Sequence, residues 1–454
     1  MRRGRAAAVC IALLAGLLWL VYGSGYIDYD VSYSLIWGRD IAHGRAPDIA
    51  AAHAPTPHPL ANMLGTVLSP LGGGAIPVIR VIGVISLAAL AYAAYRLGRA
   101  LVSSGAGVLF AAVLLTRQLL VERALLQSID IPWLALVAGA AALEAERPRR
   151  GTAVMVLLGV AGLIRPETWL LAIAYAVWLG WRAAGRQRVR LAALALIGPI
   201  VWMGFDLVAT GDPLLSLHHT SGAAERLGRT RGLGSAITHA PRFLASVLDK
   251  IALVAAAAGA VIVTAALRAR AAMPWAVLGL GGIAFLVLGA TDQPLLPRYL
   301  LLPGAMLAFF AAAAPFAWRR LERPWRVRGM VAGLAVGIAL LASFAHQRPH
   351  LVAASDYAQR QHERDDGLRS LLERRGVKGF LDRCPPIQVT YYRFGPLAAY
   401  LIDRQASAVT SVTGSLARSG SLLTRSTSGR QRPPTGFRIA YRSKPWVLAA
   451  RCAR

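Results

Sequence analysis

The residues that decide the fold stand at the start of the chain, where positions 6–40 read AAAVCIALLAGLLWLVYGSGYIDYDVSYSLIWGRD. The first 17 of these residues are uncharged and apolar, a length suited to a helix that crosses a hydrocarbon core about 30 Å thick. Two aspartates, Asp28 and Asp30, follow within a few positions. Because lipid does nothing to stabilise a carboxylate at the edge of a span, the acidic pair points to a function.

Similar apolar runs recur as far as residue 346 and define the fold class. The chain has 454 residues, of which 56% are hydrophobic and 16% charged, and its mean hydropathy is +0.49. Soluble globular proteins carry about 25% charged residues, so the composition indicates lipid as the solvent. We predict an all-α polytopic membrane protein with about eleven transmembrane helices. After the first run, the predicted spans are 76–98, 101–116, 129–143, 152–164, 168–181, 191–208, 251–267, 275–290, 298–317 and 330–346.

Arginine marks one side of the membrane. The loops YRLGRA, EAERPRRG, WRAAGRQRVR, RARAAM and WRRLERPWRVRG are arginine-rich and alternate with loops of mixed charge, which identifies them as cytoplasmic. The N-terminus is then cytoplasmic as well, and a first loop at 26–75, a long loop at 209–250 and the C-terminus lie outside the cell membrane. This topology accounts for the net charge of +28, so we expect membrane lipids and no nucleic acid as partners.

Residues 347–454 differ in kind from the predicted transmembrane domain at 1–346. A polar helical stretch, SDYAQRQHERDDGLRSLLERRGVKG, precedes strand-like runs such as IQVTYY, GFRIAYRS and WVLAARC, so we predict a small extracytoplasmic α/β domain. Positions 412–435 are rich in Ser, Arg and Gly and are predicted to form a loop. Cys384 and Cys452 are expected to form a disulfide if this domain lies outside the cell, and two free thiols are the alternative.

The acidic pair lies where a general base could form. After Asp30 comes the amphipathic stretch VSYSLIWGRDIAHG, whose aromatic and aliphatic residues favour a helix along the outer membrane interface. A carboxylate held between such a helix and a membrane span is partly removed from water, and that environment makes a usable base. The alternative is that Asp28 and Asp30 are solvated loop charges.

With these features the chain resembles the integral-membrane glycosyltransferases of the GT-C superfamily, in particular bacterial members of the actinobacterial type that use polyprenyl-phosphate sugars as donors. In that family an acidic residue just outside the first span opens an interfacial helix and serves as the catalytic base. The stretch DYDVSYSLIWGRDIAHGRAPD matches this layout, which implies Asp30 as the base. Asp28 is the alternative, since Tyr29 separates two acidic residues that are adjacent in many members.

Further stretches resemble motifs of the family in the same order, and all fall on the predicted outer side. They are TPHPL with His58, SIDIPWLALVAGAAAL with Asp130, GLIRPETWLL with Arg165 and Glu167, GDPLLSLHHT with His218, and PRYLLLP with Arg298 and Tyr299. The resemblance covers the membrane part of the chain. The C-terminal domain carries no motif that assigns it to a sugar or an acceptor.

The chemistry of the donor suggests roles for these residues. The lipid carrier of the donor leaves as an anionic phosphate, and arginine donates two parallel hydrogen bonds to phosphate. We therefore expect Arg165, Arg298 and Arg80 to bind the phosphate of the donor. Snorkelling at the membrane interface is the alternative for each arginine. The expected substrate-binding residues are Asp130, Glu167, His58, His218 and Tyr299. No His or Cys cluster has metal-ligand spacing, so we predict no metal site and no cofactor; a divalent metal can take part but is not required.

Together these features predict a membrane glycosyltransferase. The resemblance implies transfer of a hexose or pentose from a polyprenyl-phosphate donor to an acceptor hydroxyl, with inversion of the anomeric centre, as in mannosyltransferase-like members that build the cell envelope. The acceptor can be a glycan, a lipid or a protein. The alternatives are a transporter or flippase for lipid-linked sugars, which would need ionisable residues near the bilayer midplane, and a non-catalytic membrane scaffold.

Overall fold

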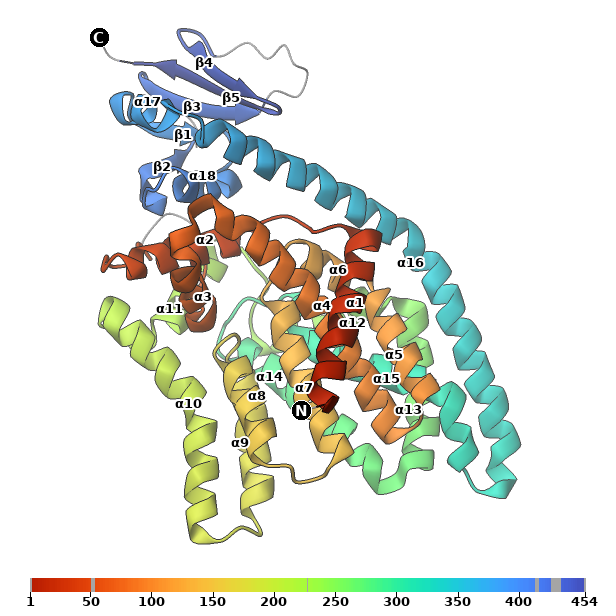
Figure 1. Cartoon of the computed structure of the whole chain (residues 1–454). Coiled ribbons are helices and arrows are strands. Elements are labelled where there is room, and N and C mark those ends of the chain that lie inside the picture. The colour runs from red at the N-terminus through yellow and green to blue at the C-terminus, as the bar shows by residue number, and fades with distance from the viewer. Residues whose placement is uncertain (1, 50–53, 227, 413–415, 426–433, 453–454) are drawn as a thin grey trace. The chain divides into compact units, whose positions relative to one another are not determined.

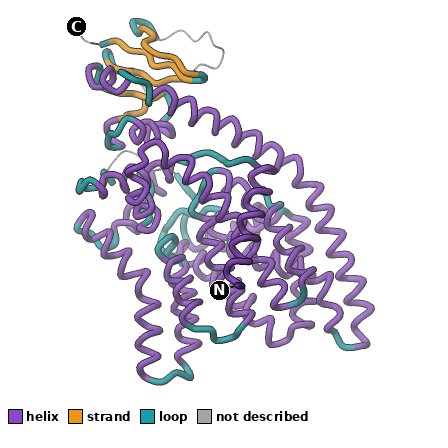
Figure 2. Tube along the Cα trace, in the orientation of Figure 1, coloured by secondary structure: helices purple, strands orange, loops and turns teal. Residues whose placement is uncertain are grey.

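The computed structural model describes residues 2–49, 54–226, 228–412, 416–425 and 434–452. The chain is mostly helical (Figure 1). Figure 2 shows the strands gathered in one small sheet. The chain forms two compact units, which are described separately below. The first comprises Met1–Tyr22, Gly83–Leu125 and Ile129–Ser355, and the second comprises Gly23–Ile82, Leu126–Ser128 and Asp356–Arg454.

The first unit consists of helices, most of which coincide with the predicted apolar runs, while those at 118–125, 215–226 and 233–248 lie between these runs. These helices are α1 (Arg2–Tyr22), α5 (Ser104–Leu115), α6 (Gln118–Leu125), α7 (Asp130–Glu146), α8 (Thr152–Gly162), α9 (Thr168–Gly180), α10 (Gly185–Thr210), α11 (Leu215–Arg226), α12 (Leu233–Leu248), α13 (Lys250–Leu267), α14 (Ala272–Ala290) and α15 (Leu301–Ala317), with a short 3₁₀ turn, η3 (Pro297–Leu300), before α15. Two further helices, α4 (Ala75–Leu101) and α16 (Arg323–Leu372), contribute residues to both units.

Several of these helices are long and apolar enough to cross a membrane. Among the described residues there are six such segments, or seven if the pair α5 and α6, bent by 67°, counts as one span. The six are Gly4–Tyr22, Pro59–Leu101, Gly185–Thr210, Lys250–Ala290, Pro297–Arg320 and Arg323–Leu372. The chain is therefore a multi-pass membrane protein, as predicted. The expected number of about eleven spans stays a prediction, since some apolar helices are shorter than a bilayer core requires.

The core of the first unit is built around α15, which is buried along nearly its whole length and packs against α5, α13 and α14. Small residues let these helices approach closely. At Gly259 of α13, an added Cβ would lie 2.5 Å from the carbonyl oxygen of Phe310. At Gly304 of α15, an added Cβ would lie 2.5 Å from Cγ1 of Val247. Steric fit between apolar residues therefore determines the packing here.

The second unit begins with the residues that follow the first apolar helix. Its helical elements are α2 (Tyr29–Ala42), α3 (Pro59–Leu68), η1 (Ser69–Gly74), α17 (Val377–Arg383), η5 (Tyr392–Phe394) and α18 (Gly395–Leu401). The helix expected after Asp30 is present as α2. Its residues from Val31 to Asp40 are all buried, so this stretch has no solvated face, although its sequence is amphipathic.

Two charged residues of α2, Arg39 and Asp40, are buried because they have ionic and hydrogen-bond partners. The Arg39 guanidinium lies 3.3 Å from Asp40 Oδ1. Arg39 also donates hydrogen bonds to the carbonyl oxygens of Tyr400 at 3.2 Å and Arg404 at 2.8 Å, at the end of α18 and just after it. These contacts join the first predicted outer loop to the C-terminal part of the chain within one compact unit.

The second unit also contains a five-stranded sheet in the order β2-β1-β3-β5-β4. The strands are β1 (Ile387–Val389), β2 (Val409–Ser411), β3 (Gly420–Arg425), β4 (Arg438–Ser443) and β5 (Trp446–Arg451). β1 pairs in parallel with β2 and β3, whereas β5 pairs antiparallel with β3 and β4. The predicted α/β part of the chain is confirmed. The expected disulfide between Cys384 and Cys452 is present and ties the residue after β5 to the segment before β1.

The loop prediction for positions 412–435 was wrong at its centre, because residues 420–425 form β3. This strand lies between β1 and β5 and is buried from Gly420 to Thr424. Its small and hydroxyl-bearing residues are typical of loops in a sequence, but here they are enclosed by neighbouring strands that pair with their backbone. Positions 413–415 and 426–433 of the predicted loop lie outside the described residues.

Candidate active site

The acidic pair lies at the start of α2 in the second unit, and both carboxylates are half-buried. Asp28 has an extended backbone (φ −77°, ψ 165°) and directly precedes the helix, while Asp30 lies in its first turn. A helix N-terminus favours anions, because its first N–H groups have no partner within the helix. Arg393 lies near Asp28: a hydrogen bond to Tyr392, together with negative charge that includes Asp28, raises the pKa of Arg393.

Tyrosine rings adjoin the acidic pair. The ring of Tyr29, which separates the two aspartates, lies 5.1 Å from the ring of Tyr33 and 5.6 Å from that of Tyr392, edge to face in both cases. Burial, with further contributions from the neighbouring tyrosines and Asp30, raises the pKa of Tyr29. Its hydroxyl keeps its proton at neutral pH and is hydrogen-bonded to that of Tyr33.

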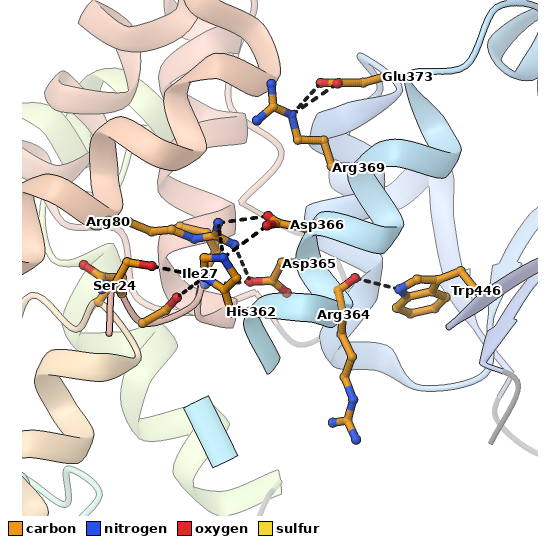
Figure 3. A network of polar contacts seen from close by, with 12 residues as sticks. Ser24, Ile27, Arg80, His362, Arg364, Asp365, Asp366, Arg369, Glu373 and Trp446 are labelled. Carbon is orange, nitrogen blue, oxygen red and sulfur yellow. Dashed lines mark hydrogen bonds and ion pairs between the residues drawn. The ribbon is translucent and has the colours of Figure 1, made fainter. Parts of the chain in front are cut away.

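The segment before the acidic pair is held by the polar C-terminal half of α16 (Figure 3). The backbone N–H of Ile27 donates to Asp365 Oδ2 at 2.8 Å. His362 Nδ1 donates to the carbonyl oxygen of Gly25 at 2.8 Å. Because Ile27 immediately precedes Asp28, these two contacts fix the backbone that presents the acidic pair.

Arg80, at the start of α4, belongs to the same network and is only 5% exposed. Its Nη1 lies 2.9 Å from Asp366 Oδ1, and its Nη2 lies 3.6 Å from Asp365 Oδ2. His362 Nε2 lies 3.1 Å from the other oxygen of Asp366. A buried arginine needs such carboxylate partners to offset its loss of hydration. Within the second unit, Arg80 therefore helps to fix α16 and the segment before α2.

The two carboxylates of this network titrate differently. They lie well beyond the apolar part of α16, since its predicted span ends at residue 346, roughly 24 Å of helix before His362. Burial raises the pKa of Asp365 to about 7. The hydrogen bond from His362 lowers the pKa of Asp366 to about 2 and raises that of His362 itself.

The sequence analysis missed His362, Asp365 and Asp366 as functional residues. In QRQHERDDGLRS they look like the solvated face of a polar helix. Their spacing of three and four positions, which places them on one face, is the one signal that could have identified them.

A second cluster, in the first unit, brings together residues from three of the predicted motifs. Arg165, in the loop before α9, is 3% exposed. Its Nη1 lies 2.6 Å from Asp130 Oδ1, and its Nη2 lies 2.5 Å from Glu167 Oε1. The guanidinium carbon also lies 4.6 Å from the ring centroid of Trp133 and 4.9 Å from that of Tyr299. Trp133, which the sequence analysis did not single out, therefore forms one wall of the cluster.

Arg298 adds a second positive charge to this cluster, with its guanidinium carbon 5.5 Å from the ring centroid of Tyr299. Asp130 and Glu167 together outweigh the charge of Arg165, and Arg298 restores neutrality. A small cavity beside these residues is lined by Trp133, Glu167, Leu171, Gly281, Ala284, Tyr299 and Leu302. The cluster thus combines an anion-binding guanidinium, carboxylates that accept hydrogen bonds and aromatic rings.

The two predicted histidines have different environments. His58 is half-buried and directly precedes α3 in the second unit. His218 lies on α11 in the first unit, where its Nδ1 lies 2.8 Å from Asp212 Oδ2 at the exposed surface. Within the described ranges, no group of three or more His, Cys, Asp and Glu side chains is arranged to hold a metal ion.

Comparison with known proteins identifies the fold. No protein-family model and no curated protein matches the chain. ArnT from Cupriavidus metallidurans, solved with bound undecaprenyl phosphate, aligns over 98% of both chains with a TM-score of 0.59 at 15% identity. The apo form of the same protein aligns over 99% of both chains with a TM-score of 0.55 at 13% identity. The chain has the ArnT fold. At this identity the likeness shows the ArnT fold alone, and it confirms the architecture expected from the resemblance to the GT-C superfamily.

Proposed function

We propose that the chain is a membrane glycosyltransferase that moves a sugar from a polyprenyl-phosphate donor to an acceptor hydroxyl, with inversion of the anomeric centre. The observation that carries this proposal is the acidic pair at the start of α2, fixed immediately after the first apolar helix in a chain with the ArnT fold. The ArnT structure contains undecaprenyl phosphate, a carrier of the proposed donor type. We place the reaction on the extracytoplasmic side, following the arginine-rich loops.

Asp30 is the proposed general base. It accepts the proton of the acceptor hydroxyl while the oxygen forms a bond to the anomeric carbon, and the bond from that carbon to the phosphate oxygen breaks. The polyprenyl phosphate leaves with the electron pair. Asp28 is the alternative base, and its charge contributes to the raised pKa of Arg393.

Arg298 and Arg165 are the proposed ligands of the donor phosphate. Asp130 and Glu167 contact Arg165, which supports an orienting role for these two carboxylates. The carboxylates of Asp130 and Glu167 would accept hydrogen bonds from sugar hydroxyls, and the hydroxyl of Tyr299 would donate one to them. Fixed positive charge at the departing phosphate supplies the electrostatic stabilisation that the reaction needs, so a divalent metal is not required.

Three of the remaining predicted residues have weaker support. Arg80 stays a candidate phosphate ligand because its Nε makes no hydrogen bond within the described residues, although its Nη1 is bonded to Asp366. His58 stays a candidate for binding substrate in the second unit. His218 is paired with Asp212 at an exposed surface, which supports a role in the local structure of the loop before α11.

The proposal is tested by donor turnover. The full-length protein in nanodiscs is given polyprenyl-phosphate mannose, glucose or arabinose with an extract of envelope acceptors, and release of polyprenyl phosphate is followed by mass spectrometry. We expect Asp30→Asn to reduce turnover by at least about 100-fold, the contribution typical of a general base. Asp382→Asn removes another carboxylate of the same unit, one paired with Arg404 at the surface, and serves as the matched control.

Two results would contradict the proposal. Normal expression and full turnover in the Asp30→Asn protein would exclude Asp30 as the base, and the same assay on Asp28→Asn would then test the alternative. Turnover of none of the three donors by the wild-type protein would argue against the glycosyltransferase itself.

A further inference from the structure

An exposed aromatic run follows β1 in the second unit. Residues 390–395 read TYYRFG, and Tyr391 and Tyr392 are 45% and 37% exposed. The ring of Tyr391 lies 5.2 Å from that of Tyr392 and 5.8 Å from that of Phe394. Tyrosine is enriched at binding surfaces, and contiguous exposed apolar groups such as these mark interaction sites.

The topology of the sheet places this run where ligands commonly bind. β1 lies between β2 and β3 and is parallel to both, so the run follows the carboxyl end of a parallel strand. From there the chain continues through α18 to β2 on one side of β1, while β3 lies on the other side. In open α/β sheets, ligands bind outside the carboxyl ends of the strands at such a point of divergence.

The same run packs against the residue that separates the two aspartates. The ring of Tyr392 lies 5.6 Å from that of Tyr29, at an interplanar angle of 76°. Tyr29 separates the two aspartates in the sequence, and Arg393 lies near Asp28. All of these residues belong to the second unit. The rings of Tyr391, Tyr392 and Tyr29 follow one another in contact, and the Arg393 guanidinium lies over the ring of Tyr392.

We propose that Tyr391, Tyr392 and Arg393 form a binding site for a hexopyranose glycan, which presents its hydroxyl to the acidic pair. The apolar C–H face of a hexopyranose packs against an aromatic ring, while the guanidinium and the tyrosine hydroxyls donate hydrogen bonds to its hydroxyl groups. The description of this glycan as the acceptor rests on the proposed function. The binding itself does not depend on it.

The composition of the surface argues against other ligands. An alkyl chain would be bound by aliphatic residues, and a free phosphate group would be repelled by the two carboxylates beside Tyr29. A neutral sugar combines the two properties that the surface offers, an apolar face and several hydroxyl groups. The site therefore gives the C-terminal sheet a function in recognising the acceptor.

The test is saturation-transfer difference NMR on the full-length protein in nanodiscs. The probes are linear tetrasaccharides of glucose, galactose and mannose at millimolar concentration. We expect at least one of them to receive saturation at its ring protons. The double variant Tyr391→Ala/Tyr392→Ala should weaken binding by roughly 2- to 10-fold for each ring removed. Tyr441→Ala removes a ring that packs on Phe380 elsewhere in the same sheet domain, and it should bind as the wild type does.

Each outcome decides the matter. No saturation of any of the three glycans, or equal saturation in the wild type and the double variant, would overturn the inference. Glycan binding without turnover of any donor would leave this site intact and contradict the proposed function instead. Donor turnover without glycan binding would support the proposed function and contradict this site.

Discussion

Asp365 and Asp366 are adjacent in the sequence, yet their pKa values shift in opposite directions from the ordinary value of 3.8. Burial raises the pKa of Asp365 to about 7, so the unfolded chain loses this proton at lower pH than the folded protein does. The free energy of unfolding therefore falls as the pH rises from about 4 to about 7. The pKa of Asp366 is lowered to about 2. Its carboxylate therefore stabilises the fold at pH values above the pKa that it has in the unfolded chain, and this contribution is lost as the pH falls toward 2.

We therefore expect Asp365→Asn to flatten the pH dependence of the melting temperature. Melting temperatures are measured by intrinsic tryptophan fluorescence of the protein in nanodiscs. Between about pH 4 and about pH 7 the melting temperature of the variant should fall less than that of the wild type. Asp366→Asn should lower the melting temperature at neutral pH and converge on the wild type in acid. Glu363→Gln, an exposed change on the same helix, is the control. A wild-type slope in the Asp365→Asn protein would show that this carboxylate is not the group that titrates.

The residues of the two clusters differ in how far sequence could predict them. The motifs around Asp130, Arg165 and Tyr299 were expected to act together, and the structure brings these side chains into contact, while their roles stay proposals. His362 and Asp365 could not be predicted in this way. Their burial comes from contact with residues about 280 to 340 positions away, and no local pattern in a polar helix encodes that contact.

Among the elements, α2 and α3 cross at two glycines with almost no clearance. A Cβ added at Gly38 would lie 2.3 Å from both the carbonyl carbon of Gly65 and the amide nitrogen of Thr66. A Cβ added at Gly65 would lie 2.3 Å from the carbonyl oxygen of Ser34. In both places the obstacle is backbone, which cannot move aside as a flexible side chain can. The position of α2, and of the acidic pair at its start, therefore depends on this close contact.

Gly38→Ala should separate the two helices and destabilise the second unit by about 1–3 kcal/mol, the usual cost of overpacking. Its melting temperature, followed by tryptophan fluorescence, should fall. Gly16→Ala in α1 is a suitable comparison, because nothing lies within 4 Å of its added Cβ, and alanine favours a helix over glycine. If both variants melt together with the wild type, the close crossing does not contribute to stability.

Helices could be predicted from the sequence where the apolar composition of a segment reflects its apolar surroundings. Each apolar run coincides with a helix, because lipid and the packed core both select the same residues. β3 was missed for the opposite reason: Ser421 and Thr424 are polar, but they are buried by β1 and β5, which are formed by other parts of the chain. A central strand made of such residues is recognisable only when its neighbours are known.

At the scale of the whole molecule, the apolar helices and the disulfide are consistent with a single topology. Disulfides persist in oxidising compartments, so the bond between Cys384 and Cys452 supports our proposal that the C-terminal part lies outside the cell. The arginine-rich loops independently support the proposal that the segments containing them are cytoplasmic.

This topology predicts the behaviour of reporter fusions. Alkaline phosphatase, which matures only outside the cytoplasm, should be active when fused after Arg454 and inactive when fused after Arg186, in a predicted cytoplasmic loop. Enzyme activity normalised to protein level in intact cells provides the measurement. The reverse pattern would invert the orientation and remove the basis for an extracytoplasmic reaction.

The hydrogen bond from the Ile27 amide to Asp365 has a consequence for hydrogen exchange. An amide held in this way exchanges its hydrogen for deuterium only when the bond opens. The exchange rate of this one amide therefore reports how often the segment that leads into the two aspartates opens. It can be measured in lipid for each variant without any substrate.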